Sequence, residues 1–270
     1  MTLKPNRKAV EAFENEAAYY DEDFENSPAM GRLRKLTTGI ALNLFKPGDT
    51  ILEMNCGTGI DAITLASQGL NVTATDGSAA MVRETAKKIA QHNLANSIRV
   101  EQCPFEELAS LRNTRFDGAF SNMGGLNCSP SLIPVAEALK QLIRPGGFLV
   151  ACMLSRFSLW ETGAFLLRGN AKMAFRRLQP EGADARLRDS RFRAYYHSPE
   201  SVEKQFGPMF QKVSITGLNI FSPPPGSRKA YKVLGKARFL LEQLDDSVAT
   251  LAPFNRIGDH FVIVLERKNV

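Results

Sequence analysis

Residues 50–78 read TILEMNCGTGIDAITLASQGLNVTATDGS. Thr50–Met54 is rich in β-prone residues, two glycines then allow a tight turn, and Ile60–Ser67 carries apolar residues at helical spacing. Strand character returns at Asn71 and ends at Asp76. A ligand lying across the turn would meet backbone N–H groups at the start of the helix, while the carboxylate of Asp76 could bind both hydroxyls of a ribose. These residues therefore predict a nucleoside-binding half-site.

Three further motifs narrow down the kind of nucleoside site. Residues 57–62 alone also fit the Gly-x-Gly-x-x-Gly/Ala fingerprint of dinucleotide-binding proteins, which leaves a nicotinamide oxidoreductase open. Glu53 before the glycine turn, Asp76-Gly77-Ser78 after the second strand and Arg144–Gly147 before a later strand go beyond that fingerprint. Together these residues resemble the class I S-adenosylmethionine-dependent methyltransferases, most of all the small-molecule group of the ubiquinone-biosynthesis and "type 11" enzymes. The resemblance spans roughly residues 19–154.

The resemblance implies an α/β fold of the Rossmann-like class I methyltransferase type. Such a fold has a seven-stranded mixed sheet whose last strand is antiparallel, helices on both faces, and here a helical cap inserted after the fifth strand. The 270 residues, 44% hydrophobic and 23% charged, suit one such domain with elaborations. We expect lid helices and the cofactor-binding half of the core in residues 1–154, the substrate cap in residues 155–197, and strands six and seven in residues 198–270. A second helical insertion, with a helix over residues 230–244, is expected at residues 222–258. Residues 116–121 are expected to form the fourth strand, and residues 192–197 of the cap alternate like a strand. Ser78 and Ser198 are expected to cap the helices that follow them.

The net charge of +6 is unevenly distributed along the chain. Residues 1–155 carry 15 basic and 17 acidic side chains, whereas residues 156–196 carry nine basic and four acidic, and residues 222–258 carry six basic and three acidic. The basic surplus therefore lies in the two segments outside the methyltransferase core. It indicates either solvated helix faces or a basic mouth for an anionic substrate or an acidic membrane surface.

Several kinds of site and location are not supported by the sequence. No window approaches the ~20 consecutive apolar residues that a membrane span needs, and the N-terminal residues lack the apolar core of a signal peptide, so we expect a cytoplasmic protein. The four cysteines have no Cys-x-x-Cys spacing and are expected to be buried free thiols. The three histidines form no ligand cluster, so no metal is expected.

The resemblance implies S-adenosylmethionine as the cofactor and S-adenosylhomocysteine as its product. Asp76 would take the ribose hydroxyls, and Glu53 would anchor the glycine loop or receive the methionine amino group. Tyr20 would fold over the cofactor as part of a lid and Met81 would cover the adenine, although both side chains could instead pack in the core. The remaining expected cofactor contacts are Asn55, Cys56, Gly57, Thr58, Gly59, Gly77, Pro104, Phe105, Ser121 and Asn122.

Two of these positions depart from the family pattern. Asn55 stands where a glycine or another small residue is usual, so its side chain must point away from the cofactor or contact the methionine part. Pro104 stands where the family has an acid that accepts a hydrogen bond from adenine N6. The backbone N–H of Phe105 could still donate to adenine N1, and Glu106 could reach the ring.

The acceptor site is expected beside the loop that follows the fourth strand. Asn122 lacks the Pro-Pro-aromatic continuation found in DNA amino-methylating relatives, which argues against methylation of a base. His197 is our first choice for a general base because imidazole titrates near neutrality, although it could simply pack or cap the next helix. Glu161, Tyr195 and Tyr196 are weaker candidates for this role. The expected substrate contacts are Met123, Asn127, Arg156, Trp160, Glu161 and Tyr195.

The sequence thus predicts methyl transfer from S-adenosylmethionine to a small organic acceptor, anionic or lipid-like. Two alternatives stay open: an RNA methyltransferase, favoured by the basic insertions, and a non-catalytic binding protein, favoured by the departures at Asn55 and Pro104. The expected partner is a small molecule rather than nucleic acid, with peripheral membrane contact, in a monomer or homodimer. The sequence does not specify the acceptor or the atom that is methylated.

Overall fold

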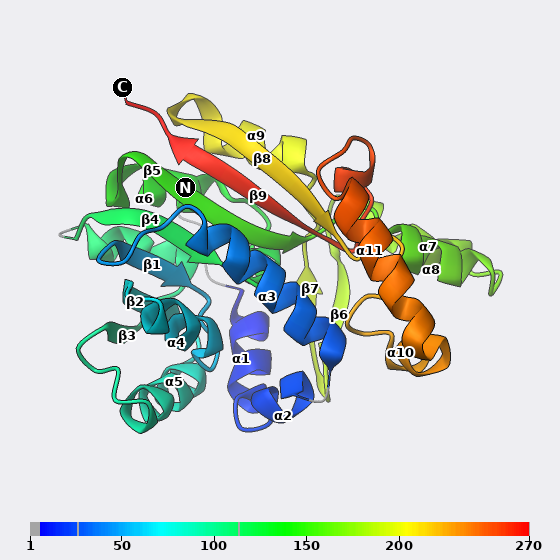
Figure 1. The fold of residues 1–270 in the computed structure, drawn as a ribbon, viewed down its shortest axis with the longest axis horizontal. Helices are drawn as coiled ribbons and strands as arrows, with labels where there is room; N and C mark the ends of the chain where they lie inside the picture. Colours follow the sequence, from blue (N-terminus) through cyan, green and yellow to red (C-terminus); the bar gives the residue numbers. More distant parts are fainter. Residues whose placement is uncertain (1–5, 26, 113, 270) are drawn as a thin grey trace.

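The computed structural model describes residues 6–25, 27–112 and 114–269. Its centre is a seven-stranded sheet in the order β3-β2-β1-β4-β5-β9-β8 (Figure 1). Strands β1 to β5 run parallel, and β9 is antiparallel to both of its neighbours. The expected mixed sheet with an antiparallel last strand is therefore confirmed. The strands are β1 (Thr50–Met54), β2 (Asn71–Asp76), β3 (Ile98–Gln102), β4 (Phe116–Ser121), β5 (Ile143–Leu154), β8 (Phe210–Leu218) and β9 (His260–Arg267).

Helices cover both faces of the sheet because side chains along each strand alternate between two cores. On β1, Ile51 belongs to the core shared with α3 (Pro28–Leu42), α4 (Ile60–Ser67) and α5 (Ala79–Gln91). Its neighbour Leu52 belongs to the opposite core, which α6 (Ile133–Leu142) and α9 (Pro199–Phe206) complete. Both side chains are fully buried. Burying one strand from both sides fixes its register.

The segment after β5 contains the helices of the expected cap and also a hairpin whose second strand overlaps the strand expected over residues 192–197. It holds α7 (Leu159–Leu166), α8 (Ala171–Ala174) and the 3₁₀ turn η3 (Arg176–Leu178), and then a two-stranded hairpin of β6 (Ala183–Leu187) and β7 (Ser190–Ala194). The hairpin turns at Arg188, whose φ is +44°. It lies beside α1 (Arg7–Glu16), where the rings of Phe13 and Phe192 are 5.8 Å apart. The N-terminal helix and the cap therefore form one wall.

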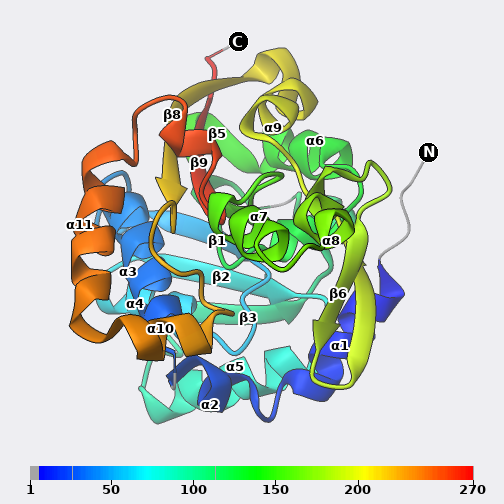
Figure 2. The same ribbon diagram turned by 90° about the vertical axis from the view of Figure 1, so that its right-hand side faces the viewer.

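The second insertion lies between β8 and β9. A single helix was expected over residues 230–244, but the structure has α10 (Arg228–Leu234) and α11 (Arg238–Val248). The break falls at Gly235, whose φ of +49° ends α10. Figures 1 and 2 show α7, α8, α10 and α11 together beyond one end of the sheet, on the side that faces the viewer in Figure 2. Within the described ranges, no helix has the length and apolarity to cross a membrane.

Candidate functional site

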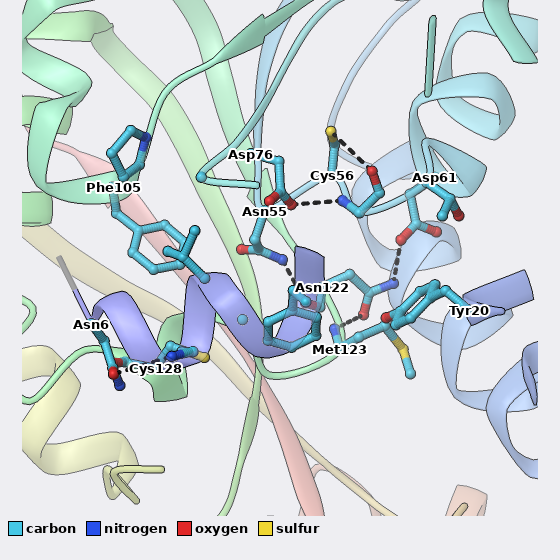
Figure 3. A pocket seen from close by; sticks show the side chains of 18 of the residues that line it. Asn6, Tyr20, Asn55, Cys56, Asp61, Asp76, Phe105, Asn122, Met123 and Cys128 are labelled. Carbon is cyan, nitrogen blue, oxygen red and sulfur yellow. Dashed lines mark hydrogen bonds between the residues drawn. The ribbon is translucent and has the colours of Figure 1, made fainter. Parts of the chain in front are cut away.

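A cavity of about 810 Å³ opens at the carboxyl ends of β1, β2 and β4 (Figure 3). The chain passes from β1 to β2 on one side and returns to β4 on the other, so this is the point where the strand order reverses. Ligands of open α/β sheets bind at such a point. Helices α1 and α2 (Tyr20–Glu25) cover the cavity with side chains that include Val10, Phe13 and Tyr20.

The glycine turn after β1 lines the cavity floor. Gly57 and Gly59 have φ values of +57° and +81°, which glycine adopts without strain. A Cβ atom at Gly59 would lie 2.7 Å from Cγ2 of Thr85, so a side chain cannot be placed there. The Gly57 N–H donates to Oδ2 of Asp76 at 2.9 Å. The turn is thus tied to the end of β2.

Asp76 is the carboxylate at the centre of the cavity. Its Oδ1 atom accepts from the backbone N–H of Ser78 at 2.9 Å, while Oδ2 accepts from the Gly57 N–H. Burial raises the pKa of Asp76 to about 6, and the backbone N–H groups oppose that rise. Each oxygen retains a second lone pair for a ligand. Two adjacent acceptors suit the two hydroxyls of a ribose.

The structure shows how Asn55 is accommodated at a position of the turn where a glycine or another small residue was expected. Its φ is +49°, the left-handed conformation that asparagine tolerates better than most residues. Its side chain donates to the Asn122 carbonyl at 2.9 Å and accepts from the Ser121 hydroxyl at 2.6 Å. A Cβ atom at Gly125 would lie 2.2 Å from Cγ of Asn55. The side chain therefore bridges the loops after β1 and β4 (Figure 3).

A buried polar cluster closes one end of the cavity. Arg34 from α3 is paired with Asp61 from the first turn of α4, and the amide of Asn122 donates to Oδ2 of Asp61 at 3.1 Å. Oδ1 of Asp61 is buried and has no hydrogen-bond partner within the described residues. Burial lowers the pKa of Arg34, but Asp61 and Tyr20 more than offset this, so the guanidinium stays charged. A charged pair with a spare carboxylate oxygen can receive a zwitterion.

Glu53 lies behind this cluster rather than in the cavity wall. It is buried on β1, and its Oε2 atom has no hydrogen-bond partner within the part of the chain that is described. Burial, reinforced by the charge of Asp61, raises the pKa of Glu53 well above its ordinary value. Glu53 does not belong to the cavity lining.

The opposite end of the cavity is formed by the start of the 3₁₀ helix η1 (Phe105–Leu111). Pro104, Phe105 and Glu106 all line it. Phe105 is the first residue of this helix, so its backbone N–H lies outside the intrahelical hydrogen-bond pattern. Burial raises the pKa of Glu106. A backbone donor beside a partly buried carboxyl can take the place of the acid that the family has at position 104.

The lid contacts come from α1 and α2. A Cβ atom on Gly57 would lie 3.6 Å from the Tyr20 ring, so Tyr20 lies over the glycine turn. The Thr58 hydroxyl donates to Asp21 at 2.5 Å, which joins α2 to the same turn. Asn6 caps α1, and its amide donates to the carbonyls of Cys128 and Arg193 at 3.0 and 3.1 Å. The lid is thus attached both to the core and to the cap.

A second and larger cavity of about 1290 Å³ adjoins the first. Its wall comes from α1, the loop after β4, the end of β5, the β6–β7 hairpin and the loop before α10. The two cavities share a wall of four side chains, which are Phe13, Tyr20, Met123 and Cys128. Two adjoining cavities at one sheet edge can hold two ligands in contact.

The structure brings most of the predicted cofactor residues into the first cavity. Those that line it are Tyr20, Asn55, Cys56, Gly57, Thr58, Asp76, Gly77, Pro104, Phe105 and Asn122. Glu53, Gly59 and Ser121 stand behind the lining. Met81 is 1% exposed and also lies outside the lining, so its position is that of a core methionine in the first turn of α5. Sequence reasoning missed Arg34, Asp61 and Cys128.

The predicted acceptor residues divide into two groups. Met123 lines both cavities and Asn127 lines the second, where its amide is fully used by the backbone of Leu154 and Tyr195. Arg156, Trp160 and Tyr195 lie in neither lining. Glu16 and residues 185–187 of the hairpin also line the second cavity and were not singled out in the sequence.

The expectation for Glu161 is corrected by its ion pairs. Its Oε2 atom accepts from Arg177 at 2.5 Å and its Oε1 atom from Arg176 at 2.7 Å. Arg177 is 6% exposed and also pairs with Asp259 at 2.7 Å. These bonds lower the pKa of Glu161 although burial alone would raise it. Glu161 therefore anchors the cap to the start of β9 and does not face an acceptor.

His197 is also corrected, because its ring is turned into the protein. It is 6% exposed and lines neither cavity. One ring nitrogen, Nε2, is 3.1 Å from the Ser129 carbonyl, and the Gln205 amide lies 3.4 Å from Nδ1. Burial lowers the pKa of His197. A neutral ring that donates from Nε2 and accepts at Nδ1 satisfies both contacts, so the packing alternative describes this histidine.

Metal chemistry has no ligand set within the described part of the chain. No group of three or more His, Cys, Asp and Glu side chains among these residues could hold a metal ion. The four cysteines are buried and free. Burial raises the pKa of Cys128 and Cys152 to about 12, which keeps both as neutral thiols.

Comparison with known proteins gives a consistent result. A family model described as a methyltransferase domain matches residues 51–147. The chain is 30% identical over 145 residues to the ubiquinone biosynthesis O-methyltransferase of Xanthomonas campestris pv. campestris (strain B100). The aligned residues cover 53% of this chain and 57% of that relative. The chain therefore spans about half the length of the curated relatives it matches. The family model covers the part of the chain that holds the glycine turn, Asp76 and Phe105.

Solved structures extend the similarity to the whole fold. The geranyl diphosphate C-methyltransferase of Streptomyces coelicolor A3(2), solved with Mg²⁺, geranyl diphosphate and S-adenosyl-L-homocysteine, has a TM-score of 0.56 at 13% identity over 88% of this chain and 80% of its own. The [4+2]-cyclase SpnF has a TM-score of 0.54 at 14% identity over 87% and 80%. At such identities the likeness concerns the fold alone. The cyclase illustrates that this fold also carries other chemistry.

Proposed function

Because residues 51–147 form a class I S-adenosylmethionine-dependent methyltransferase domain, we propose that the chain transfers a methyl group from S-adenosylmethionine to a small organic acceptor. The single observation that carries this proposal is the placement of Asp76. Its carboxylate holds the glycine turn and retains acceptor capacity toward the first cavity. The cavity stands at the position where this fold binds nucleosides.

The residues of the first cavity fit the cofactor at both ends. The buried Oδ1 atom of Asp61 lacks a partner within the described residues, and an ammonium group would supply one. Arg34, which also lines the cavity, would take the methionine carboxylate. At the other end, the Phe105 N–H and Glu106 would meet the adenine, and Asp76 would hold the ribose. We therefore assign the first cavity to S-adenosylmethionine.

The bound sulfonium supplies an activated methyl group, so the protein's main task is alignment. The shared wall of Phe13, Tyr20, Met123 and Cys128 would lie between the methyl donor and an acceptor in the second cavity. Tyr20 and the lid helices would exclude water from the donor. Proximity and orientation in such a site supply much of the acceleration without a metal or a covalent intermediate.

The finer features of the acceptor and location also belong to this proposal. The wall of the second cavity is predominantly apolar, which favours a small lipid-like acceptor over RNA, whose phosphates need basic contacts. Asn55 and Pro104 leave the first cavity open, which favours a catalytic over a purely structural protein.

The four free buried cysteines favour the cytoplasm as the compartment. We further propose peripheral contact with membranes through the insertions.

The test is isothermal titration with S-adenosylhomocysteine, using the chain and an Asp76→Ala variant. We expect micromolar binding that falls at least tenfold in the variant, because two charge-assisted hydrogen bonds to the ribose are lost. Glu137→Ala, an exposed change on α6, is the matched control and should bind as the unchanged protein does. NAD should not bind. Absence of S-adenosylhomocysteine binding by the folded protein would contradict the proposal.

A further inference from the structure

We propose that the acceptor is an anionic amphiphile. Its apolar body would fill the second cavity, and its anionic group, such as a carboxylate, would be bound at the cavity mouth by Arg186 and Arg191. This inference rests on the proposed function, which it deepens by naming the class of acceptor. Both arginines belong to the β6–β7 hairpin, outside the residues that the family model covers.

The hairpin has one apolar and one basic face, because side chains alternate along each strand. The residues of the apolar face that line the second cavity are Ala185, Leu187, Phe192 and Ala194. Arg186, Arg191 and Arg193 alternate with them and are exposed. Figure 2 shows the hairpin beside α1, which its apolar face contacts through Phe192. The hairpin thus places a row of arginines just outside an apolar cavity.

The register of the hairpin brings two of these arginines face to face. Arg186 on β6 is directly opposite Arg191 on β7. Arg193 lies two residues further along β7, so it shares this face and is diagonal to Arg186. Like charges directly opposite one another in a sheet are destabilising. An anion bound between the two guanidinium groups would remove that cost, since guanidinium groups hold carboxylates through paired N–H donors.

The acidic side chains near this face neutralise it only weakly. Asp189 in the turn is 3.5 Å from Arg186, and Asp184 on β6 is 3.8 Å from Arg193. Both aspartate side chains are exposed, so water screens the two ion pairs. A ligand anion at the edge of an apolar cavity would be screened less than either aspartate. It can therefore compete with them for the arginines.

Arg186 joins the basic face to the cavity. Among the described residues, the charged side chains that line the second cavity are Arg186 and Glu16. Glu16 is buried and pairs with Arg188 at 3.0 Å, so an arginine balances its charge inside the wall. Arg186 is held at the turn by donating from Nε to the Arg188 carbonyl. The exposed residues of the lining are Arg186 and Gly226, so the mouth opens between the hairpin and the loop before α10.

The cavity behind this mouth suits an apolar body. Its walls also include Phe13, Met30 and Leu154, and the amide of Asn127 is used by backbone groups. A strongly hydrated ligand would lose its water there without compensation. The inner end of the cavity is the wall that it shares with the first cavity. An amphiphile held by its anion at the mouth would therefore present its other end to the methyl donor.

The experiment titrates octanoate and its neutral isostere octanamide into the protein by calorimetry, far below the concentration at which micelles form. Both probes have the same apolar chain, so the difference between them reports the anionic group. We expect octanoate to bind about tenfold more tightly, because it gains charge-assisted hydrogen bonds. In the double variant Arg186→Gln, Arg191→Gln, the two probes should bind alike and octanamide should keep its affinity.

The matched control is the double variant Lys87→Gln, Arg99→Gln. It also removes two exposed positive charges, but from α5 and β3, outside both insertions. It should keep the full preference for octanoate. An equal loss of preference in both double variants would show that the net charge of the protein attracts the anion, and it would overturn the assignment to the hairpin.

Two further measurements test the place of the apolar body. Ala185→Trp on β6 would fill the cavity from the hairpin side and should abolish binding of both probes. Acetate, which has the anionic group without the chain, should bind at least tenfold more weakly than octanoate to the unchanged protein. If acetate binds as tightly as octanoate, the anion binds on the outer surface alone and the proposal is wrong. The acetate result decides even if Ala185→Trp does not fold.

A membrane role for the same arginines is a separate outcome. If the hairpin double variant loses binding to phosphatidylglycerol vesicles but still prefers octanoate about tenfold, the arginines serve a lipid surface and do not recognise the acceptor. That result would also overturn the proposal.

The outcomes separate this inference from the proposed function, because every variant is also titrated with S-adenosylhomocysteine. If S-adenosylhomocysteine binds but octanoate and octanamide bind equally, the anionic acceptor is wrong and the methyltransferase proposal stands. If S-adenosylhomocysteine does not bind to the folded protein, the proposed function itself is wrong.

Discussion

At the scale of single residues, Asn55 combines an unfavourable backbone conformation with two favourable hydrogen bonds. Replacement by glycine relieves the left-handed backbone but removes the bridge to Ser121 and Asn122. We expect Asn55→Gly to lower the free energy of unfolding by about 1 kcal/mol, because a buried hydroxyl loses its partner. Asn55→Ala should cost about 1 kcal/mol more, since alanine is disfavoured at positive φ. Urea denaturation of the three proteins measures both steps.

The order of the two variants is the informative result. If glycine is at least as stable as asparagine, the side-chain bridge contributes nothing and Asn55 is only a tolerated substitution. If alanine equals glycine, the backbone at this position relaxes out of the left-handed region.

The protonation of Asp76 should make both folding stability and ligand binding in the first cavity depend on pH. Its pKa of about 6 in the folded protein exceeds that of a free aspartate because burial disfavours the charged form. Its contribution to folding stability is thus fully present below the unfolded pKa and is lost as pH rises through about 6. Ribose hydroxyls prefer the ionised carboxylate, so S-adenosylhomocysteine should bind about fourfold more weakly at pH 5.5 than at pH 7.5.

Calorimetry at the two pH values measures this difference. The weakening of binding at pH 5.5 should be absent in Asp76→Asn, which should bind S-adenosylhomocysteine weakly at both pH values. An unchanged affinity in the unsubstituted protein would mean that ligand binding does not depend on the charge of this carboxyl.

At the scale of elements, α1 is held to the start of α5 by one carboxylate. Glu14 accepts from the Ser78 hydroxyl at 2.6 Å and from the Ala80 N–H at 2.9 Å, and it pairs with Arg83 at 3.2 Å. Burial raises the pKa of Glu14, but these bonds outweigh it and the pKa is lowered. The stabilisation is therefore present above the unfolded pKa and is lost as pH falls through the folded value.

Glu14→Gln should release α1 without unfolding the core. A glutamine keeps only one acceptor oxygen and no charge, so we expect hydrogen exchange of the amides of residues 7–16 to accelerate about fivefold to tenfold. The strands should exchange at the same rate as before. Glu11→Gln is the control on the same helix. Equal acceleration throughout the molecule would show that Glu14 stabilises the fold as a whole rather than the lid.

The elements of the core were predictable because local and tertiary preferences agree there. Residues 50–54, 60–67 and 116–121 form the elements expected of them, and Ser78 and Ser198 cap helices as their positions predict. Strand character was expected over residues 192–197, which overlap β7, but the pairing of β7 with β6 was not predicted, because the hairpin packs against α1, far away in sequence. The expected helix over residues 230–244 was wrong at Gly235, where one residue interrupts a continuous helical pattern.

The candidate site was predictable only where it follows from the glycine turn. Asp76 and its neighbours were found because the chain presents them in order. Glu16 was not found, because nothing in a helical stripe distinguishes a cavity carboxylate from a solvated one. His197 was misjudged for a related reason: its chemistry is visible in the sequence, but the contacts of its ring with Ser129 and Gln205 are not.

At the scale of the whole molecule, the two insertions give one face a distinct surface. Of the 13 strongly exposed large apolar side chains in the described residues, ten lie in residues 155–197 and 222–258. The same segments carry the basic surplus. Helices α7, α8, α10 and α11 gather on the face shown in Figure 2. Exposed apolar and basic side chains together are typical of a surface that docks on anionic lipid.

We expect the protein to sediment with phosphatidylcholine vesicles that contain phosphatidylglycerol and not with phosphatidylcholine alone. Each Lys or Arg near the surface contributes about 1 kcal/mol at low salt, so added salt should release the protein. Leu240→Glu on α11 should weaken binding, because it places a negative charge on the docking face. Ile133→Glu on α6, outside both insertions, is the matched control. Equal effects of the two changes would exclude this face as the contact surface.

The wall shared by the two cavities links their occupants thermodynamically. Phe13, Tyr20, Met123 and Cys128 cannot rearrange around one ligand without changing what the other meets. Any factor by which a ligand in the first cavity alters the affinity of the second must equal the factor by which a ligand in the second cavity alters the affinity of the first. The fold therefore possesses a single coupling constant between the two cavities. Its sign determines whether two bound ligands strengthen or weaken one another's binding at the same four side chains.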